Sequence, residues 1–146
     1  ASNMKPSLLY DTLKEIEQGA VSCLDPGTFC SMVWPGCDPP TTCDLGLSVA
    51  VFGEIVNQSS ACSITTFFDV TIQVSICNPD SANYADSTVD SEDFYTKLLG
   101  VYGGLLVWWN GREDKCKMVK SDGFRCGGSN GSTCSRYFST WRIQVD

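Results

Sequence analysis

Cysteine and carboxylate side chains are the groups in this sequence best suited to chemistry, because the chain has nine cysteines and no histidine. Without histidine, Ser-His-Asp and Cys-His hydrolases, histidine-dependent ribonucleases and the usual zinc enzymes are excluded. No two cysteines are separated by only two residues, so zinc-knuckle and thioredoxin-like spacings are also missing. Disulfide bonds are the better use for these residues. The candidates are Cys23, Cys30, Cys37, Cys43, Cys62, Cys77, Cys116, Cys126 and Cys134.

The cysteines and two glycosylation sequons together predict a secreted protein. The sequons begin at Asn57 and Asn130, in surroundings typical of turns, and suit passage through an oxidising compartment. We therefore expect an extracellular protein whose signal peptide has been removed. Nine cysteines allow four disulfides and leave one thiol, which is either buried and inert or links two chains as a dimer. The sequence does not say which cysteines pair.

Glu54 and Asp69 come nearest to a catalytic pair. Both lie on polar positions of alternating segments, and in some registers they are neighbours. Two carboxylates are the minimum for glycoside hydrolysis, but solvated charges on an exposed face are far commoner. We therefore expect no enzyme activity and no cofactor. The acidic residues 78–93 lack the glycine-containing calcium-loop pattern, so no metal site is expected.

The segment 45–77 must supply the scaffold that positions these groups, because it reads as a long β-hairpin. Apolar residues fall on odd positions before the turn and on even positions after it, the period of half-buried strands. The odd set is Leu45, Leu47, Val49, Val51 and Ile55, and the even set is Ile64, Phe68, Val70, Ile72, Val74 and Ile76. For both sets to share a face, opposed residues must have numbers with an odd sum.

Two short helices are predicted. Residues 6–18 place apolar side chains at helical spacing, with Gly19 as the stop signal. The second helix covers residues 91–99, with Asp90 or Ser91 as its cap, Glu92 and Asp93 near the positive end of the helix dipole, and Gly100 as the stop.

The remaining segments carry the candidate binding residues. Residues 23–43 read as an irregular disulfide-bridged loop that presents a rigid apolar anchor or tucks it under the loop. Residues 101–120 read as a second hairpin around Asn110-Gly111, with aromatic residues along its first strand. A glycine-rich loop at 123–134 and a strand at 135–145 end the chain. The candidate binding residues are Met32, Val33, Trp34, Tyr102, Trp108 and Trp109.

The whole chain, 1–146, is thus predicted to be one α+β domain with a mainly antiparallel sheet of about five strands, two short helices and disulfide staples. A net charge of −7 disfavours nucleic acid as a partner. The longest apolar run, residues 98–109, is shorter than the roughly 20 residues of a membrane-spanning helix.

The predicted function is recognition of another extracellular protein, a receptor or a soluble ligand, through the constrained loops. The alternative is a carrier that holds a small apolar ligand in an aromatic-lined cavity. A carboxylate-based hydrolase is the least favoured function, because the sequence does not place two carboxylates such as Glu54 and Asp69 in one cleft.

Overall fold

The computed structural model describes residues 6–41, 43–77, 91–113, 118–119, 123–129 and 134–145. Its centre is the predicted hairpin, in which β2 (Leu47–Ser59) pairs antiparallel with β3 (Ile64–Cys77). Val51 opposes Ile72, so the opposed residue numbers have an odd sum, as expected. The alternating apolar residues therefore share one face and form the centre of the core.

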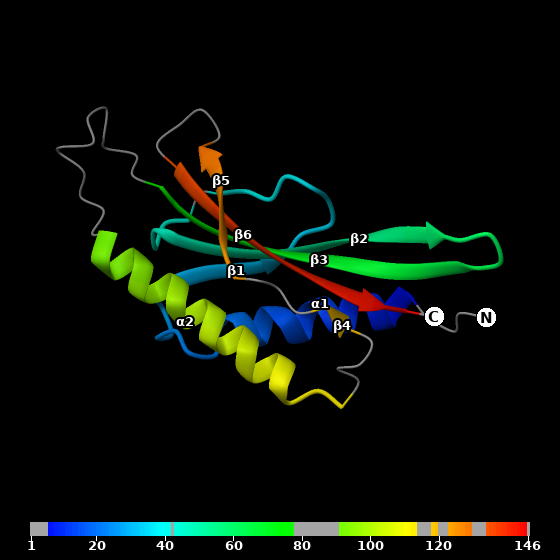
Figure 1. The fold of residues 1–146 in the computed structure, drawn as a ribbon. Coiled ribbons are helices and arrows are strands. Elements are labelled where there is room, and N and C mark those ends of the chain that lie inside the picture. Colours follow the sequence, from blue (N-terminus) through cyan, green and yellow to red (C-terminus); the bar gives the residue numbers. More distant parts are fainter. Residues whose placement is uncertain are drawn as a thin grey trace.

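A mostly antiparallel sheet extends from this hairpin, in the order β1-β2-β3-β6-β4, with β5 also paired to β6 (Figure 1). β6 (Cys134–Gln144) confirms the expected final strand and lies antiparallel to β3. β4 (Met118–Val119) and β5 (Arg125–Ser129) both pair with β6 on its other side. With two helices and a disulfide between Cys30 and Cys43, the α+β prediction is confirmed.

Two strands appear where irregular loops were expected. β1 (Phe29–Val33) lies within 23–43 and pairs parallel with β2. It lacks clear alternation, because most of its side chains are only half-buried, so the strand depends on backbone pairing with the edge of β2. β5 occupies the glycine-rich segment, where a β-carbon on Gly127 would overlap the Phe138 ring. The glycine thus makes room for an aromatic neighbour in β6.

α2 (Ser91–Asn110) corrects the largest error of the sequence prediction. The helix expected at 91–99 continues through Gly100, and the strand expected from 101 to 109 is its second half. The predicted hairpin 101–120 is therefore wrong. Asn110-Gly111 ends the helix instead, where the Gly111 N–H donates to the Val107 carbonyl at 3.1 Å.

α1 (Pro6–Val21) also runs past its predicted stop at Gly19. The reason is helix packing: a β-carbon on Gly19 would lie 2.8 Å from Cβ of Trp108, and one on Gly104 would overlap the Gly19 carbonyl oxygen. The two glycines allow the helix backbones to approach closely. Glycines inside a helix cost about 1 kcal/mol each relative to alanine, and this contact offsets the cost.

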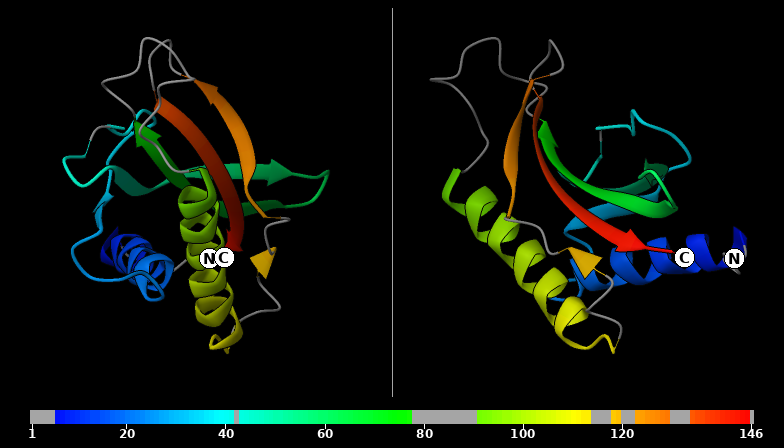
Figure 2. Two further views of the ribbon diagram at one scale, coloured as in Figure 1. Left: turned by 90° about the vertical axis from the view of Figure 1, so that its left-hand side faces the viewer. Right: turned by 45° about the vertical axis from the view of Figure 1, so that its right-hand side comes forward.

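Both helices lie on the same side of the sheet (Figure 2). There Ile16 of α1, Val101 and Leu105 of α2 and Trp141 of β6 are completely buried with the apolar face of the hairpin. On the opposite face, the segment that follows β1 covers one end of the sheet, and the Ser75 hydroxyl donates to the Thr41 carbonyl at 3.4 Å. The first half of β2 is therefore enclosed on both faces.

The helix contact predicts opposite effects for two adjacent glycines. Gly104→Ala should destabilise the protein by about 1–3 kcal/mol, because the new methyl group overlaps the α1 backbone. Gly103→Ala is the matched control: a β-carbon there meets nothing within 4 Å, so better helix propensity should stabilise by about 0.5–1 kcal/mol. Urea unfolding measures both variants. Equal changes in the free energy of unfolding would contradict this account of the helix contact.

Candidate functional site

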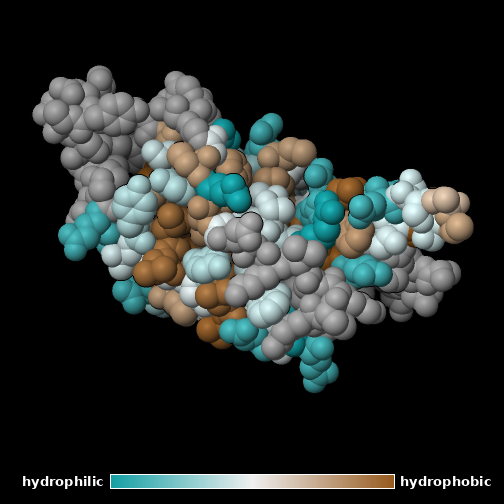
Figure 3. All heavy atoms as spheres, in the orientation of Figure 1, coloured by the Kyte–Doolittle hydropathy of each residue, from teal (hydrophilic) through white to brown (hydrophobic). Residues whose placement is uncertain are grey.

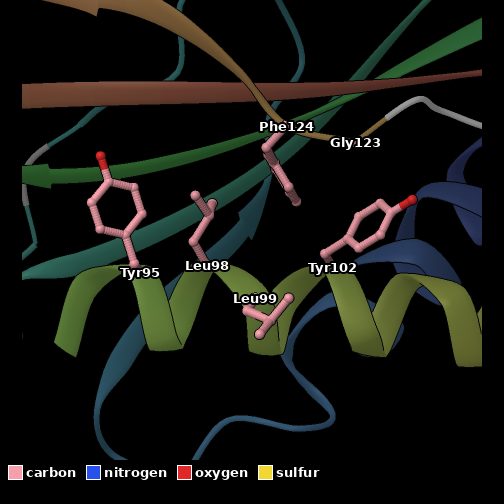
Figure 4. Close-up of a pocket in the computed structure, with 6 residues that line it drawn as sticks. All are labelled: Tyr95, Leu98, Leu99, Tyr102, Gly123 and Phe124. Atoms are coloured by element: carbon pink, nitrogen blue, oxygen red, sulfur yellow. The ribbon is translucent and has the colours of Figure 1, made fainter. Parts of the chain in front are cut away.

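A groove of about 410 Å³ lies between α2 and the residues that lead into β5. Its walls are mainly apolar and aromatic, and Figure 4 shows Phe124 pointing toward α2 between Leu98 and Tyr102. The Tyr102 and Phe124 rings meet edge to face, 6.2 Å apart. The lining residues are Tyr95, Leu98, Leu99, Tyr102, Gly123 and Phe124.

The outer side of α2 extends this groove into an exposed apolar stripe, which we define as Tyr95, Leu99 and Val107. Their exposed fractions are 55%, 71% and 67%. The spacing of four and eight residues places them on one side of the helix. Figure 3 shows hydrophobic surface along α2. Single exposed apolar residues are ordinary, whereas several on one side of a helix beside a groove are typical of an interaction site.

An aromatic cluster holds one end of the groove in place. The Tyr95 and Tyr137 hydroxyls are 3.1 Å apart, and the Phe94 ring lies 5.7 Å from both tyrosine rings. The hydrogen bond to Tyr95 and partial burial raise the pKa of Tyr137 to about 12. A neutral phenol pair therefore links α2 to β6 beside the groove.

The three aromatic candidates of the predicted second hairpin separate in the structure. Tyr102 lines the groove, but Trp108 packs edge to face on buried Trp141, with ring centroids 5.8 Å apart. Trp109 also packs against the core. Trp108 is further covered by the Arg112 guanidinium, 5.2 Å from its ring, which also forms a 3.0 Å ion pair with Glu15. Trp108 thus joins the two helices and the sheet.

The other three candidates lie at a distant edge of the sheet. Met32 and Val33 belong to β1, and the Trp34 N–H continues the pairing by donating to the Val51 carbonyl at 2.9 Å. All three side chains are half-buried. Since β2 and β3 lie between β1 and β6, the structure does not bring this segment together with Tyr102.

The carboxylates Glu54 and Asp69 are opposed in the hairpin register. Asp69 accepts two hydrogen bonds from Arg142 of β6, at 2.7 and 2.9 Å, and these raise the pKa of the guanidinium further. Arg142 also lies 5.0 Å from the Phe67 ring. Asp69 therefore has a structural role as the partner that fixes Arg142 across β3 and β6.

The cysteines differ most from expectation. Cys30 and Cys43 form a disulfide and Cys134 is disulfide-bonded, but Cys23, Cys37, Cys62 and Cys126 are free and exposed. The expectation of four bridges and one spare thiol is therefore wrong. Cys116 lies outside the described residues, and the Cys77 backbone opposes Cys134.

Within the described residues, no group of three or more His, Cys, Asp or Glu side chains is arranged to hold a metal ion. Nor is any helix among them long and apolar enough to cross a membrane. The sequon residue Asn57 is exposed in β2 rather than in a turn, where its side-chain oxygen accepts a hydrogen bond from Thr66 at 3.1 Å. Asn130 lies outside the described residues.

Sequence reasoning missed Tyr95, Leu98, Leu99 and Phe124 as groove residues. The error followed from ending the helix at Gly100, because a helix of 91–110 places Tyr95, Leu99 and Tyr102 at spacings of four and three. Phe124 carried no local signal, because its contact with Tyr102 is made only in the folded chain.

No family model matches this chain, and no curated protein sequence matches it. Among solved structures, a chain from the virion of a native gene transfer agent particle is similar, with 12% identity and a TM-score of 0.37. The match covers 94% of this chain and 90% of that chain. A likeness at this level supports no inference about function.

Titration should detect the phenol pair. Because the folded-state pKa of Tyr137 is raised, its stabilising effect is complete below pH 10 and is lost as the pH rises toward about 12. Tyr95→Phe removes the hydrogen bond, so the last phenol should ionise at lower pH in an ultraviolet titration. Tyr10→Phe, at an exposed site on α1, is the control. An unchanged last step in Tyr95→Phe would contradict the assignment.

Thiol labelling should reproduce the cysteine pattern. Iodoacetamide applied to the folded protein without reductant should modify Cys23, Cys37, Cys62 and Cys126, because these thiols are exposed. Cys30 and Cys43 should react only after reduction. Peptide mass spectrometry identifies the modified sites. Recovery of Cys23 or Cys37 in a disulfide-linked peptide would restore the expectation of a fully bridged loop.

Proposed function

We propose that this chain is an extracellular protein-recognition domain that binds an apolar segment of another protein in the groove beside α2. The observation that carries the proposal is the exposed apolar stripe of Tyr95, Leu99 and Val107 next to that groove. Burial of apolar surface drives most protein association, and tyrosine is enriched among the residues that contribute most binding energy.

The shape of the groove favours a protein segment over a small molecule. Sites for small ligands bury most of the ligand surface inside a concave cavity. Here two lining residues, Tyr95 and Leu99, are more than half exposed, so one wall is open to solvent. The carrier alternative therefore has the weaker support, although a volume of about 410 Å³ is within the range of ligand sites.

The charged residues of α2 also favour an apolar protein segment as the partner. Lys97, the basic residue of α2, forms an ion pair with Asp93 at 2.9 Å, one turn away. The wall itself presents aromatic rings and aliphatic side chains. The expected partner is therefore an aliphatic or aromatic segment rather than an acidic peptide.

The extracellular location and the covalent dimer are parts of the same proposal. The Cys30–Cys43 disulfide and the exposed sequon at Asn57 support secretion. Four exposed free thiols are uncommon in an oxidising compartment, so the labelling pattern of secreted protein bears directly on this point. Any one of those thiols can supply the link between two chains.

Site-specific photo-crosslinking tests the groove. A photoreactive amino acid at position 99 should crosslink a partner protein from extracellular fluid, because Leu99 projects from the stripe. The same residue at position 45 is the matched control, since Leu45 is also an exposed leucine, at 51%, but lies outside α2. A crosslinked band specific to position 99 is the expected result.

Substitution of the same two leucines completes the test. Leu99→Ser should weaken capture of that partner by about tenfold or more, the loss expected for a central apolar contact, whereas Leu45→Ser should not. Both substitutions are at exposed sites and should change stability by less than about 0.5 kcal/mol. Equal crosslinking at both positions, or a small apolar molecule retained in native mass spectrometry, would reject protein recognition at this groove.

A further inference from the structure

The outer edge of β2 is paired along only part of its length. β2 runs from Leu47 to Ser59 and pairs throughout with β3, but β1 covers it only from Leu47 to Val51. The last hydrogen bond on that side, within the described residues, runs from the Trp34 N–H to the Val51 carbonyl. Figure 1 shows β2 continuing beyond β1 toward the hairpin turn. We call residues 52–59 the free edge.

The alternation of backbone groups identifies which atoms the free edge offers. In a strand, the N–H and C=O of one residue point to the same side, and successive residues alternate. Because the Val51 carbonyl points away from β3, the backbone groups of Gly53, Ile55, Asn57 and Ser59 do so as well. The residues between them bond to β3.

The free edge carries little of the usual protection against pairing, because Glu54 is its single charged side chain. Natural edge strands are commonly interrupted by lysine, proline or a bulge. Residues 52–59 contain no lysine and no proline, and their register with β3 is continuous. Ile55 and Ile64 lie on the core face of the hairpin but beyond the core, with 61% and 65% of their surface exposed.

We propose that the free edge pairs with the free edge of a second copy of this chain, antiparallel and with two-fold symmetry centred on Ile55. In this register Gly53 opposes Asn57 of the second copy, and the two Ile55 residues oppose each other. Each opposed pair exchanges two hydrogen bonds, so every outward group of Gly53, Ile55 and Asn57 is satisfied. A register centred on Asn57 would pair as many outward residues, but it would oppose Ile55 to Ser59 and lose the isoleucine pair.

Side-chain chemistry also fits this register. The Ile55 side chains of both copies lie on the same face, where they form an apolar cross-strand pair. Glu54, the charge on the free edge, opposes Val56 of the second copy instead of another Glu54. A two-fold interface of this kind is the commonest symmetry of soluble oligomers.

The two proposed surfaces lie at different sites. The groove is formed by α2 and the residues before β5, beside β6, whereas the free edge belongs to β2 on the other side of β3. Partner binding and self-pairing are therefore compatible, and either can fail alone. Asn57 lies within the pairing segment, so the protein used for the test is made without glycans.

Analytical ultracentrifugation over a dilution series tests the pairing, with free thiols alkylated so that no covalent dimer forms. The unmodified sequence should show a reversible monomer–dimer equilibrium. Ile55→Lys should weaken association by about tenfold, because it removes the isoleucine pair and opposes two like charges. Ile64→Lys is the matched control: it is equally exposed on the same face, but on β3 and away from the edge.

Amide hydrogen exchange tests the proposed pairing register between the two copies. At high protein concentration the amides of Gly53, Ile55 and Asn57 should gain protection, whereas those that already bond to β3 should not change. A monomer at every concentration would overturn the proposal and leave the edge to a strand of another protein. Equal weakening by both lysine variants, or protection confined to α2, would also overturn it, because the dimer would then use another surface.

Discussion

The close contact between α1 and α2 is the constraint on which the rest of the structure depends. Gly19 and Gly104 let the two backbones meet, and Trp108 fills the space between that contact and buried Trp141 of β6. This arrangement fixes both helices on one face of the sheet and turns the Leu105 side of α2 inward. The opposite side of the same helix is consequently left apolar and uncovered, which creates the groove wall.

The sheet is covered unevenly. Near the first half of β2, the helices cover one face and the segment around Thr41 covers the other. Beyond Val51, β2 has neither β1 at its edge nor the core below Ile55. The molecule therefore has one enclosed region that contributes most to stability and two exposed apolar surfaces at its margins, where we propose that association occurs.

Sequence periodicity predicted the hairpin well and α2 badly, for reasons that are physical. In the hairpin, the alternation restricted the register to steps of two, and the observed pairing of Val51 with Ile72 obeys that restriction. In α2, Val101 and its neighbours are apolar at nearly every position, which fits a buried strand or a buried helix. Gly19 and Gly100 were both interpreted as helix stops, because the sequence does not show that Gly19 packs against Trp108, a residue distant in sequence. The groove could not be predicted for the same reason, since Phe124 reaches Tyr102 only after β5 pairs with β6.

The position of β6 has a consequence for the order of folding. This late strand lies inside the sheet, between β3 on one side and β4 and β5 on the other. Phe67 pairs with Gln144, so the two residues are separated by about half of the sequence. Contacts that join such distant residues slow folding, and a nascent chain cannot complete its sheet until β6 has left the ribosome. During synthesis, β3 presents an open edge that only the last strand closes.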